Sequence, residues 1–352
     1  QPKELFAGIS SKKIDVLFGY QIVNWGRTDG FNPTNNISPN DYFFLSAEPD
    51  DQKESNLLLR LKYKFTSNID LECITIPFYT PSNYRFDLFE LGDNVRFKST
   101  MIPELKLKNG TFAARLNFEL PVAGWSLSYF NGFDPFHGYN VETMDWSGGQ
   151  LQLTNTPTPY RKSTLGLDAA IPAGNFIFRT EAAYNKTKNY EHKMYIPAPD
   201  ISYVLAAETQ IAGATIIGQY IGKFIPDFKA LVIPSTPSCP DPIAQMQYAS
   251  LMVEYENNYM NRLIFQQQKK SNHAFSFSLI KSFGYDVFEA ELSAYYNLTS
   301  SDLMIRPKLV WKIGDAVSTT FGGVYMNGKN KSLFTYTSDV LSGAFVQLKV
   351  SF

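Results

Sequence analysis

The last nine residues of the chain, AFVQLKVSF (residues 344–352), alternate between two kinds of side chain. One face of this segment is apolar and ends in an aromatic ring: Ala344, Val346, Leu348, Val350 and Phe352. The residues between them are mostly polar. A period of two residues is typical of a β-strand whose faces meet different surroundings. Because chain ends usually fray unless something holds them, the pattern predicts a final strand whose last side chain is in use.

Composition narrows the class of protein. The 352 residues carry a formal net charge of -1, which argues against nucleic-acid binding, because that function needs a basic face. No apolar run reaches the length of about 18 residues that would predict a transmembrane helix. Aromatic residues make up 15% of the chain, yet its mean hydropathy is only -0.20. A water-soluble protein this aromatic would bury its rings in a core and be more hydrophobic overall.

The two-face pattern repeats along the whole chain as hairpins. In residues 56–65, leucines alternate with charged residues before a tight polar turn at 66–68, and a second strand follows. Similar pairs lie at 3–25, 111–130, 163–184, 201–222, 274–296 and 303–325, and long polar stretches separate them at 26–55, 80–107, 134–160, 187–198 and 224–257. We find no long helical periodicity. Residues 1–352 are therefore expected to form a single all-β domain.

The alternation of short turns with long loops predicts the architecture. It places every short turn at one end of the sheet and every long loop at the other, as in an outer-membrane barrel. The strands span about ten to thirteen residues, longer than most soluble strands. Their polar faces carry charges that the core of a soluble β-sandwich could not hold unpaired. Aromatic residues lie near the predicted strand ends: Trp125, Tyr129, Tyr184, Tyr203, Tyr220, Trp311 and Tyr325.

We therefore expect a transmembrane antiparallel up-and-down β-barrel of about 14–16 strands in the outer membrane of a Gram-negative bacterium. Its short turns would be periplasmic and its long loops extracellular. About fifteen strands can be read, whereas bacterial single-chain barrels have even numbers. The first strand (3–9) and the last also run in the same direction. We expect one or more strands to precede Gln1, and about sixteen in the closed barrel, with fourteen as the alternative.

The polar faces of the strands carry balanced charges. We predict that the following residues line the lumen: Arg60, Lys62, Lys64, Asp70, Glu72, Arg115, Glu119, Asp168, Arg179, Glu181, Glu208, Glu289, Glu291, Arg306, Lys308 and Lys312. The hairpin turns would set Lys64 opposite Asp70, Lys62 opposite Glu72, and Arg179 opposite Asp168. Such charges either form the walls of a wet pore or only satisfy one another and stiffen the wall; the two readings are compatible.

Two segments resemble known families. The terminal Phe352, with Val350 and Leu348 on the same face, resembles the C-terminal signature of Gram-negative outer-membrane proteins. The resemblance implies recognition by the barrel-assembly machinery during biogenesis. Residues 18–42, FGYQIVNWGRTDGFNPTNNISPNDY, resemble a poorly characterised porin-like family with a Gly-x-Gln-x-Val-x-Trp-Gly segment and an Asn-Pro-rich loop. Tyr20 stands where that family usually has Arg. The family is associated with porin-like transport or with export of apolar molecules.

In this segment, alternation points Gln21 and Val23 into the lumen. The loop that begins at Gly26 is then free to fold inward, and Trp25, Asn32 and Pro33 are candidates for a constriction. The alternative is that these three residues only fix a rigid loop.

Catalysis is not supported by the sequence. None of the three histidines, His137, His192 and His273, has a neighbour at a spacing that suggests a nucleophile and its base. The two cysteines form no metal-ligand spacing, and no cofactor or metal is expected.

Two functions remain. One is a porin-like channel or substrate-specific barrel for small or partly apolar solutes. The other is a non-conducting barrel that docks other outer-membrane proteins through its long loops, of which 224–257 is unusually apolar and would either plug the lumen or cover a partner. Outer-membrane lipid and lipopolysaccharide are expected partners in both cases.

Overall fold

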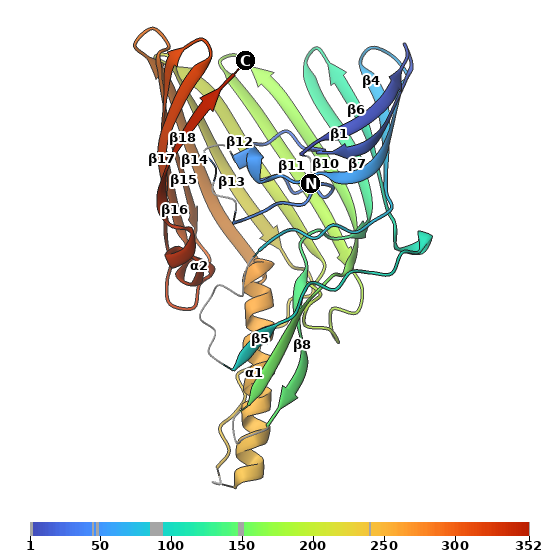
Figure 1. Ribbon diagram of the computed structural model, residues 1–352, viewed down its shortest axis with the longest axis vertical. Helices are drawn as coiled ribbons and strands as arrows, with labels where there is room; N and C mark the ends of the chain where they lie inside the picture. The colour runs from blue at the N-terminus through green and yellow to red at the C-terminus, as the bar shows by residue number, and fades with distance from the viewer. Residues whose placement is uncertain are drawn as a thin grey trace.

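The computed structural model of the chain describes residues 3–43, 46, 49–84, 94–146, 151–238 and 241–351. Fifteen strands form one continuous sheet in which every neighbouring pair is antiparallel, and the sheet curves into a barrel wall (Figure 1). In the order of pairing, the strands are β1 (Leu5–Ser10), β2 (Ile14–Gln21), β3 (Asn56–Lys64), β4 (Ile69–Ile76), β6 (Thr111–Leu120), β7 (Ala123–Phe133), β10 (Arg161–Ala173), β11 (Phe176–Thr187), β12 (Asp200–Ile211), β13 (Ala214–Phe224), β14 (Ser271–Phe283), β15 (Phe288–Asn297), β16 (Leu303–Gly314), β17 (Val317–Asn327) and β18 (Gly343–Val350).

Short turns and long loops lie at opposite ends of the barrel. The turns gather at the end where the chain terminates, and the long connections extend from the other end (Figure 1). The expected transmembrane antiparallel β-barrel is therefore confirmed. Among the described residues, no helix combines the length and apolar character that a membrane crossing needs.

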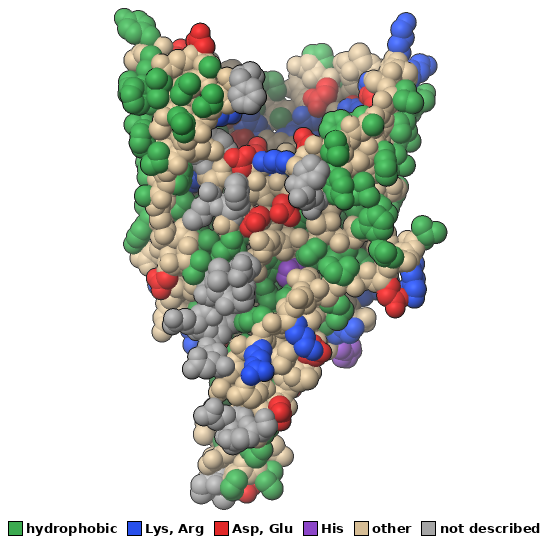
Figure 2. Space-filling model, viewed as in Figure 1, with side chains coloured by type: hydrophobic (Ala, Val, Ile, Leu, Met, Phe, Trp, Pro, Cys, Tyr) green, Lys and Arg blue, Asp and Glu red, His purple; other side chains and the backbone are tan. Residues whose placement is uncertain are grey.

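The outer wall of the barrel is apolar. On β3, Leu59 and Leu61 are 41% and 42% exposed, while Leu58, one residue away, is completely buried on the inner face. The same alternation exposes Leu165 on β10 and Phe178 on β11. Hydrophobic side chains accordingly cover much of the visible outer surface (Figure 2). Exposure of a continuous apolar band of this size to water would be unfavourable in free energy, so the band faces lipid.

Turn geometry sets the register of each hairpin, and it corrects one predicted pair. The hairpin of β10 and β11 turns on two residues, beginning with Gly174 at φ +61°. This left-handed conformation suits glycine, and it keeps Ala173 within β10. Asp168 consequently lies opposite Glu181, and Arg179 lies opposite Ala170. The expected pairing of Arg179 with Asp168 is wrong, whereas Lys62 with Glu72 and Lys64 with Asp70 are register partners as predicted.

The long connections contain structure that the sequence pattern did not reveal. Helices α1 (Pro242–Ile264) and α2 (Leu333–Leu341) correct the expectation of a purely β chain. Strands β5 (Val95–Phe97), β8 (Gly138–Asp145) and β9 (Gln152–Thr158) form a small second sheet beside α1. Helix α1 was missed because its buried residues include Asn257 and Asn261, so no apolar stripe marks its packed face. It projects away from the barrel (Figure 1), which argues against its serving as a plug.

Strands β1 and β18 are the two edges of the large sheet, and no pairing joins them among the described residues. The expected sixteen-strand closure and the single-domain organisation stay predictions. Of the C-terminal signature, Phe352 lies outside the described residues. Leu348 and Val350 are 65% and 54% exposed on the lipid-facing side of β18.

Candidate functional site in the barrel lumen

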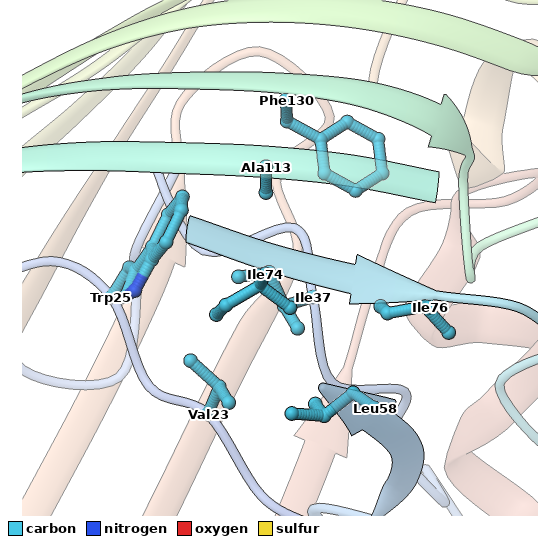
Figure 3. Packing of buried hydrophobic residues seen from close by; sticks show 8 residues of the cluster. All are labelled: Val23, Trp25, Ile37, Leu58, Ile74, Ile76, Ala113 and Phe130. Atoms are coloured by element: carbon cyan, nitrogen blue, oxygen red, sulfur yellow. The ribbon is translucent and has the colours of Figure 1, made fainter. Parts of the chain in front are cut away.

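The connection after β2 folds into the barrel and packs on its inner wall. Val23, Trp25 and Ile37 from this connection form a buried cluster with inward-facing residues of four strands: Leu58, Ile74, Ile76, Ala113 and Phe130 (Figure 3). Each of the three loop side chains is at most 3% exposed. The Trp25 indole also donates a hydrogen bond to Oε1 of Glu72 at 2.9 Å. Apolar burial of this kind, worth about 1.5–3 kcal/mol per large side chain, fixes the start of the loop to the wall formed by β3, β4, β6 and β7.

From Trp25 the loop continues along the inner wall to β11, where one carboxylate binds it. Glu181 on β11 is completely buried. Its Oε1 accepts hydrogen bonds from the backbone N–H of Arg27 (2.6 Å) and Thr28 (2.8 Å), from the Thr28 hydroxyl (2.8 Å) and from the Asn32 amide (2.9 Å). Its Oε2 accepts from the Thr34 hydroxyl at 2.8 Å. Glu181 therefore anchors residues 27–34 to the barrel.

Gly26 allows the carboxylate to come this close. Its φ is +101°, a region that other residues rarely adopt, and a Cβ there would lie 2.5 Å from Oε1 of Glu181. The structure thus explains why residue 26 is a glycine: only glycine permits both the backbone conformation and the approach of Glu181.

Arg27 connects the same loop to charges on the wall. Its Nε donates to Oδ1 of Asp168 at 2.7 Å, and its Nη2 donates to Oε1 of Glu119 at 2.6 Å. Asp168 is only 1% exposed and also pairs with Arg115 at 3.2 Å. A buried carboxylate between two guanidinium groups has the partners that such a group requires. Arg27 was not among the predicted lumen residues, although a cation next to the Trp-Gly dipeptide was a usable signal.

The tip of the loop reaches strands well beyond β11. The backbone carbonyl of Asp29 accepts a hydrogen bond from Gln219 of β13 at 2.7 Å. The Phe31 ring stacks on Tyr295 of β15 with 5.2 Å between centroids. A connection that starts at β2 and touches β15 crosses the lumen, because these strands are far apart in the sheet order. Further along, the carbonyl of Ser46 accepts from Arg306 of β16 at 2.5 Å.

The predicted lumen charges form ion pairs on the inner face. Within the first strands the pairs run diagonally: Arg60 with Glu72 (2.6 Å), Lys62 with Asp70 (3.3 Å) and Lys64 with Asp15 (2.6 Å). On other strands the pairs are Arg179 with Glu208 (2.5 Å) and Lys308 with Glu291 (2.7 Å). Lys312 borders an open hollow at the short-turn end, and Glu289 lies opposite Val310 without an ion pair to any described residue.

Of the three predicted constriction residues, two make contacts that fix the loop. Trp25 packs on β3, β4, β6 and β7 and hydrogen-bonds to Glu72 of β4, and Asn32 binds Glu181 of β11. Pro33 contributes its carbonyl, which accepts a hydrogen bond from Asn36 at 3.3 Å. These contacts fix the loop, whereas a constriction of the lumen by the three residues stays a prediction.

A second polar and aromatic cluster lies outside the barrel wall and was not anticipated. Tyr84, Tyr139 and Tyr160 pack with Phe265 near the base of α1. His137 is 3% exposed and stacks on Tyr84 with 4.3 Å between ring centroids. Burial lowers the pKa of His137 to about 4, although Asp134 acts in the opposite direction. The cluster ties the small sheet and α1 to the barrel.

No family model matches the chain, and no curated protein matches it. Among solved structures, OccAB4 of Acinetobacter baumannii aligns over 93% of this chain and 70% of its own, with a TM-score of 0.50 and 11% identity. OccAB2 of the same organism covers 99% and 76%, with a TM-score of 0.50 and 10% identity. OccK3 (OpdO) of Pseudomonas aeruginosa covers 98% and 79%, with a TM-score of 0.50 and 8% identity.

At such low identities the likeness concerns the fold alone, the antiparallel barrel described above. The apolar outer band requires lipid around the barrel on physical grounds alone. The band and the barrel fold together agree with the expected location in the outer membrane of a Gram-negative bacterium.

Proposed function

We propose that this protein is a diffusion channel for small solutes, narrowed by the loop formed by residues 22–40. The observation that carries the proposal is the attachment of this loop to separate parts of the wall: Trp25 to Glu72 on β4, residues 27–34 to Glu181 on β11, and Phe31 to Tyr295 on β15. A loop fixed to strands this far apart in the sheet leaves a passage of defined cross-section. The loop then restricts the size of the solutes that pass, and it does not block the lumen as a flexible chain would.

The charged side chains on the inner face of the barrel favour the passage of polar molecules. The inner-face charges are paired but remain partly accessible: Arg60 and Lys62 are each 31% exposed, and Glu119 is 54% exposed. Water-filled channels have polar interiors of this kind. Because cations and anions alternate around the wall, neither sign of charge dominates, which favours zwitterionic or neutral polar solutes.

An apolar contact is also available near the loop tip. Phe31 and Tyr295 stack at an interplanar angle of 20°, and the ring centroids of Phe334 and Tyr295 are 6.1 Å apart. Aromatic rings beside paired charges suit solutes with both polar and apolar parts. This combination supports the narrower proposal of a substrate-specific barrel for small or partly apolar solutes. Relationship to the porin-like Trp-Gly family, which rests on residues 18–42, is part of the same proposal.

We favour transport over the docking alternative because the inward-folded loop and the charged inner wall are features of the lumen, where a solute would pass. For the same reason we propose transport rather than catalysis.

Conductance of the purified full chain in a planar lipid bilayer tests the channel. We expect discrete conductance steps with weak ion selectivity, and larger steps in a variant that lacks residues 27–36. The variant's barrel is checked by its different migration before and after boiling on a detergent gel. If both folded proteins leave the bilayer non-conducting, the proposal is wrong.

A further inference from the structure

A surface loop on the outside of the barrel has the chemistry of a membrane anchor. The loop, residues 98–110, precedes β6 and ends in the short 3-10 helix η3 (Leu107–Asn109). We call it the rim loop. Its large apolar side chains face outward: Met101 is 50% exposed, Ile102 56%, Leu105 74% and Leu107 102%. This concentration of exposed apolar side chains in one short segment requires an explanation.

The position of the rim loop supplies the first part of that explanation. The teal segment before β6 projects sideways from the outer wall, at the end of the barrel where the long loops lie (Figure 1). In the same view, hydrophobic side chains of this projection lie beside charged ones (Figure 2). Directly after the loop, Phe112 of β6 is 43% exposed on the lipid-facing side. The apolar surface of the rim loop therefore continues the lipid-facing band.

Hydrogen bonds hold the rim loop in this position. The backbone N–H of Met101 donates to the carbonyl of Pro157 at 2.9 Å. Arg161 donates to the carbonyl of Lys108 at 3.0 Å, and the Asn109 amide donates to the carbonyl of Glu104 at 2.8 Å. A loop with these attachments presents its leucines outward as part of the fold, so their exposure is a built feature.

The charges of the rim loop identify the kind of surface it meets. The segment contains three lysines, Lys98, Lys106 and Lys108, and one acid, Glu104. Lys98 pairs with Glu142 at 2.7 Å and Lys106 pairs with Glu104, whereas Lys108 forms no ion pair with a described residue. The loop is thus net positive beside an apolar face. Segments of this composition lie in the interface of anionic membranes, with apolar residues among the acyl chains and lysines at the phosphates.

We propose that the rim loop is an interfacial anchor that binds anionic lipid of the outer leaflet. Leu105 and Leu107 enter the acyl region, and Lys106 and Lys108 contact lipid phosphate groups. The inference depends on the membrane fold and does not depend on solute transport. A protein partner on the same surface would instead keep the leucines out of lipid.

A fluorescent probe that reports on its surroundings tests the apolar part. Cysteine is introduced by Leu107→Cys in a chain that carries Cys73→Ser and Cys239→Ser, and is labelled with an environment-sensitive dye. Val232→Cys is the matched control, because Val232 is 84% exposed and apolar but precedes the projecting helix α1. In phosphatidylcholine bilayers we expect blue-shifted emission and quenching by spin-labelled lipid only at residue 107. Equal, water-like signals at both positions would overturn the proposal.

Lipid selectivity tests the lysines. Quenching at residue 107 is compared in bilayers whose quencher is carried by phosphatidylglycerol or by phosphatidylcholine. We expect preference for phosphatidylglycerol, and a loss of that preference by about fivefold for each lysine removed in Lys106→Gln and Lys108→Gln. Lys12→Gln with Lys13→Gln, in the turn at the opposite end, serves as the control. Unchanged preference in the rim-loop variants would refute the anionic-lipid assignment, and gel migration before boiling shows that each variant is folded.

Discussion

Replacing Glu181 by Gln should weaken the attachment of the loop formed by residues 22–40 while leaving the barrel intact. The substitution keeps the shape of the side chain and removes its charge. The amide can still accept hydrogen bonds at the position of Oε1, where Arg27, Thr28 and Asn32 donate. At the other position an NH₂ group replaces the oxygen that accepts from the Thr34 hydroxyl. No atom of the barrel ladder is altered.

The expected magnitude follows from the number of bonds. A hydrogen bond to a charged group contributes about 1.5–3 kcal/mol, and one between neutral groups about 0.5–1.5 kcal/mol. Loss of roughly 1 kcal/mol in each bond, reduced because the bonds share one carboxylate, weakens the anchor by about 2–4 kcal/mol. The population of detached loop then rises roughly 30- to 900-fold.

Hydrogen exchange at the amides of Arg27 and Thr28 measures this directly, since both N–H groups are bound to Glu181 in the closed loop. We expect faster exchange at these two amides in the variant, together with noisier and larger channel currents. Glu119→Gln is the control: it removes the charge that pairs with Arg27, but Glu119 is 54% exposed and its charge should contribute little. Unchanged exchange in a folded Glu181→Gln barrel would show that the carboxylate does not hold the loop.

Three further outcomes are expected. Leu61→Arg on the lipid-facing side should destabilise the barrel by about 2–4 kcal/mol, whereas Lys62→Ala on the inner face should be mild for stability and shift ion selectivity; refolding yields and reversal potentials check both, and the reverse order would mean that the faces are assigned backwards. Unboiled protein should migrate differently from boiled protein on a detergent gel, because a barrel whose strands are hydrogen-bonded to one another resists detergent; identical migration would contradict the fold. The folded-state pKa of His137, about 4, lies below its unfolded value near 6.5, so the neutral form stabilises the cluster above pH 6.5 and that stability declines as pH falls toward 4. His137→Phe keeps the stacking on Tyr84 and should abolish this decline, as measured by hydrogen exchange in residues 134–140 at pH 7 and pH 4.5.

Local sequence determined the wall of the barrel. The face that each strand residue occupies follows from alternation with a period of two, and for this reason Leu59 and Leu61 could be assigned to lipid and Arg60 and Lys62 to the lumen before the fold was known. The two-residue periodicity survives in the structure because a membrane strand has one apolar and one polar neighbour along its whole length. Even here, register depended on one detail, the left-handed Gly174, which shifted the predicted partner of Arg179.

The contacts of the loop formed by residues 22–40 were decided by tertiary structure alone. Arg27 meets Asp168 across 141 residues of sequence, and Asn32 meets Glu181 across 149. No local periodicity encodes such contacts, because they depend on which strands the curved sheet brings face to face. Helix α1 escaped prediction for a related reason: two of its four buried residues are asparagines, Asn257 and Asn261, whose partner, the backbone of Tyr139, lies more than a hundred residues away. Sequence patterns report the medium that surrounds each face of an element, whereas the partners inside the barrel are decided only when the sheet curves and brings distant strands together.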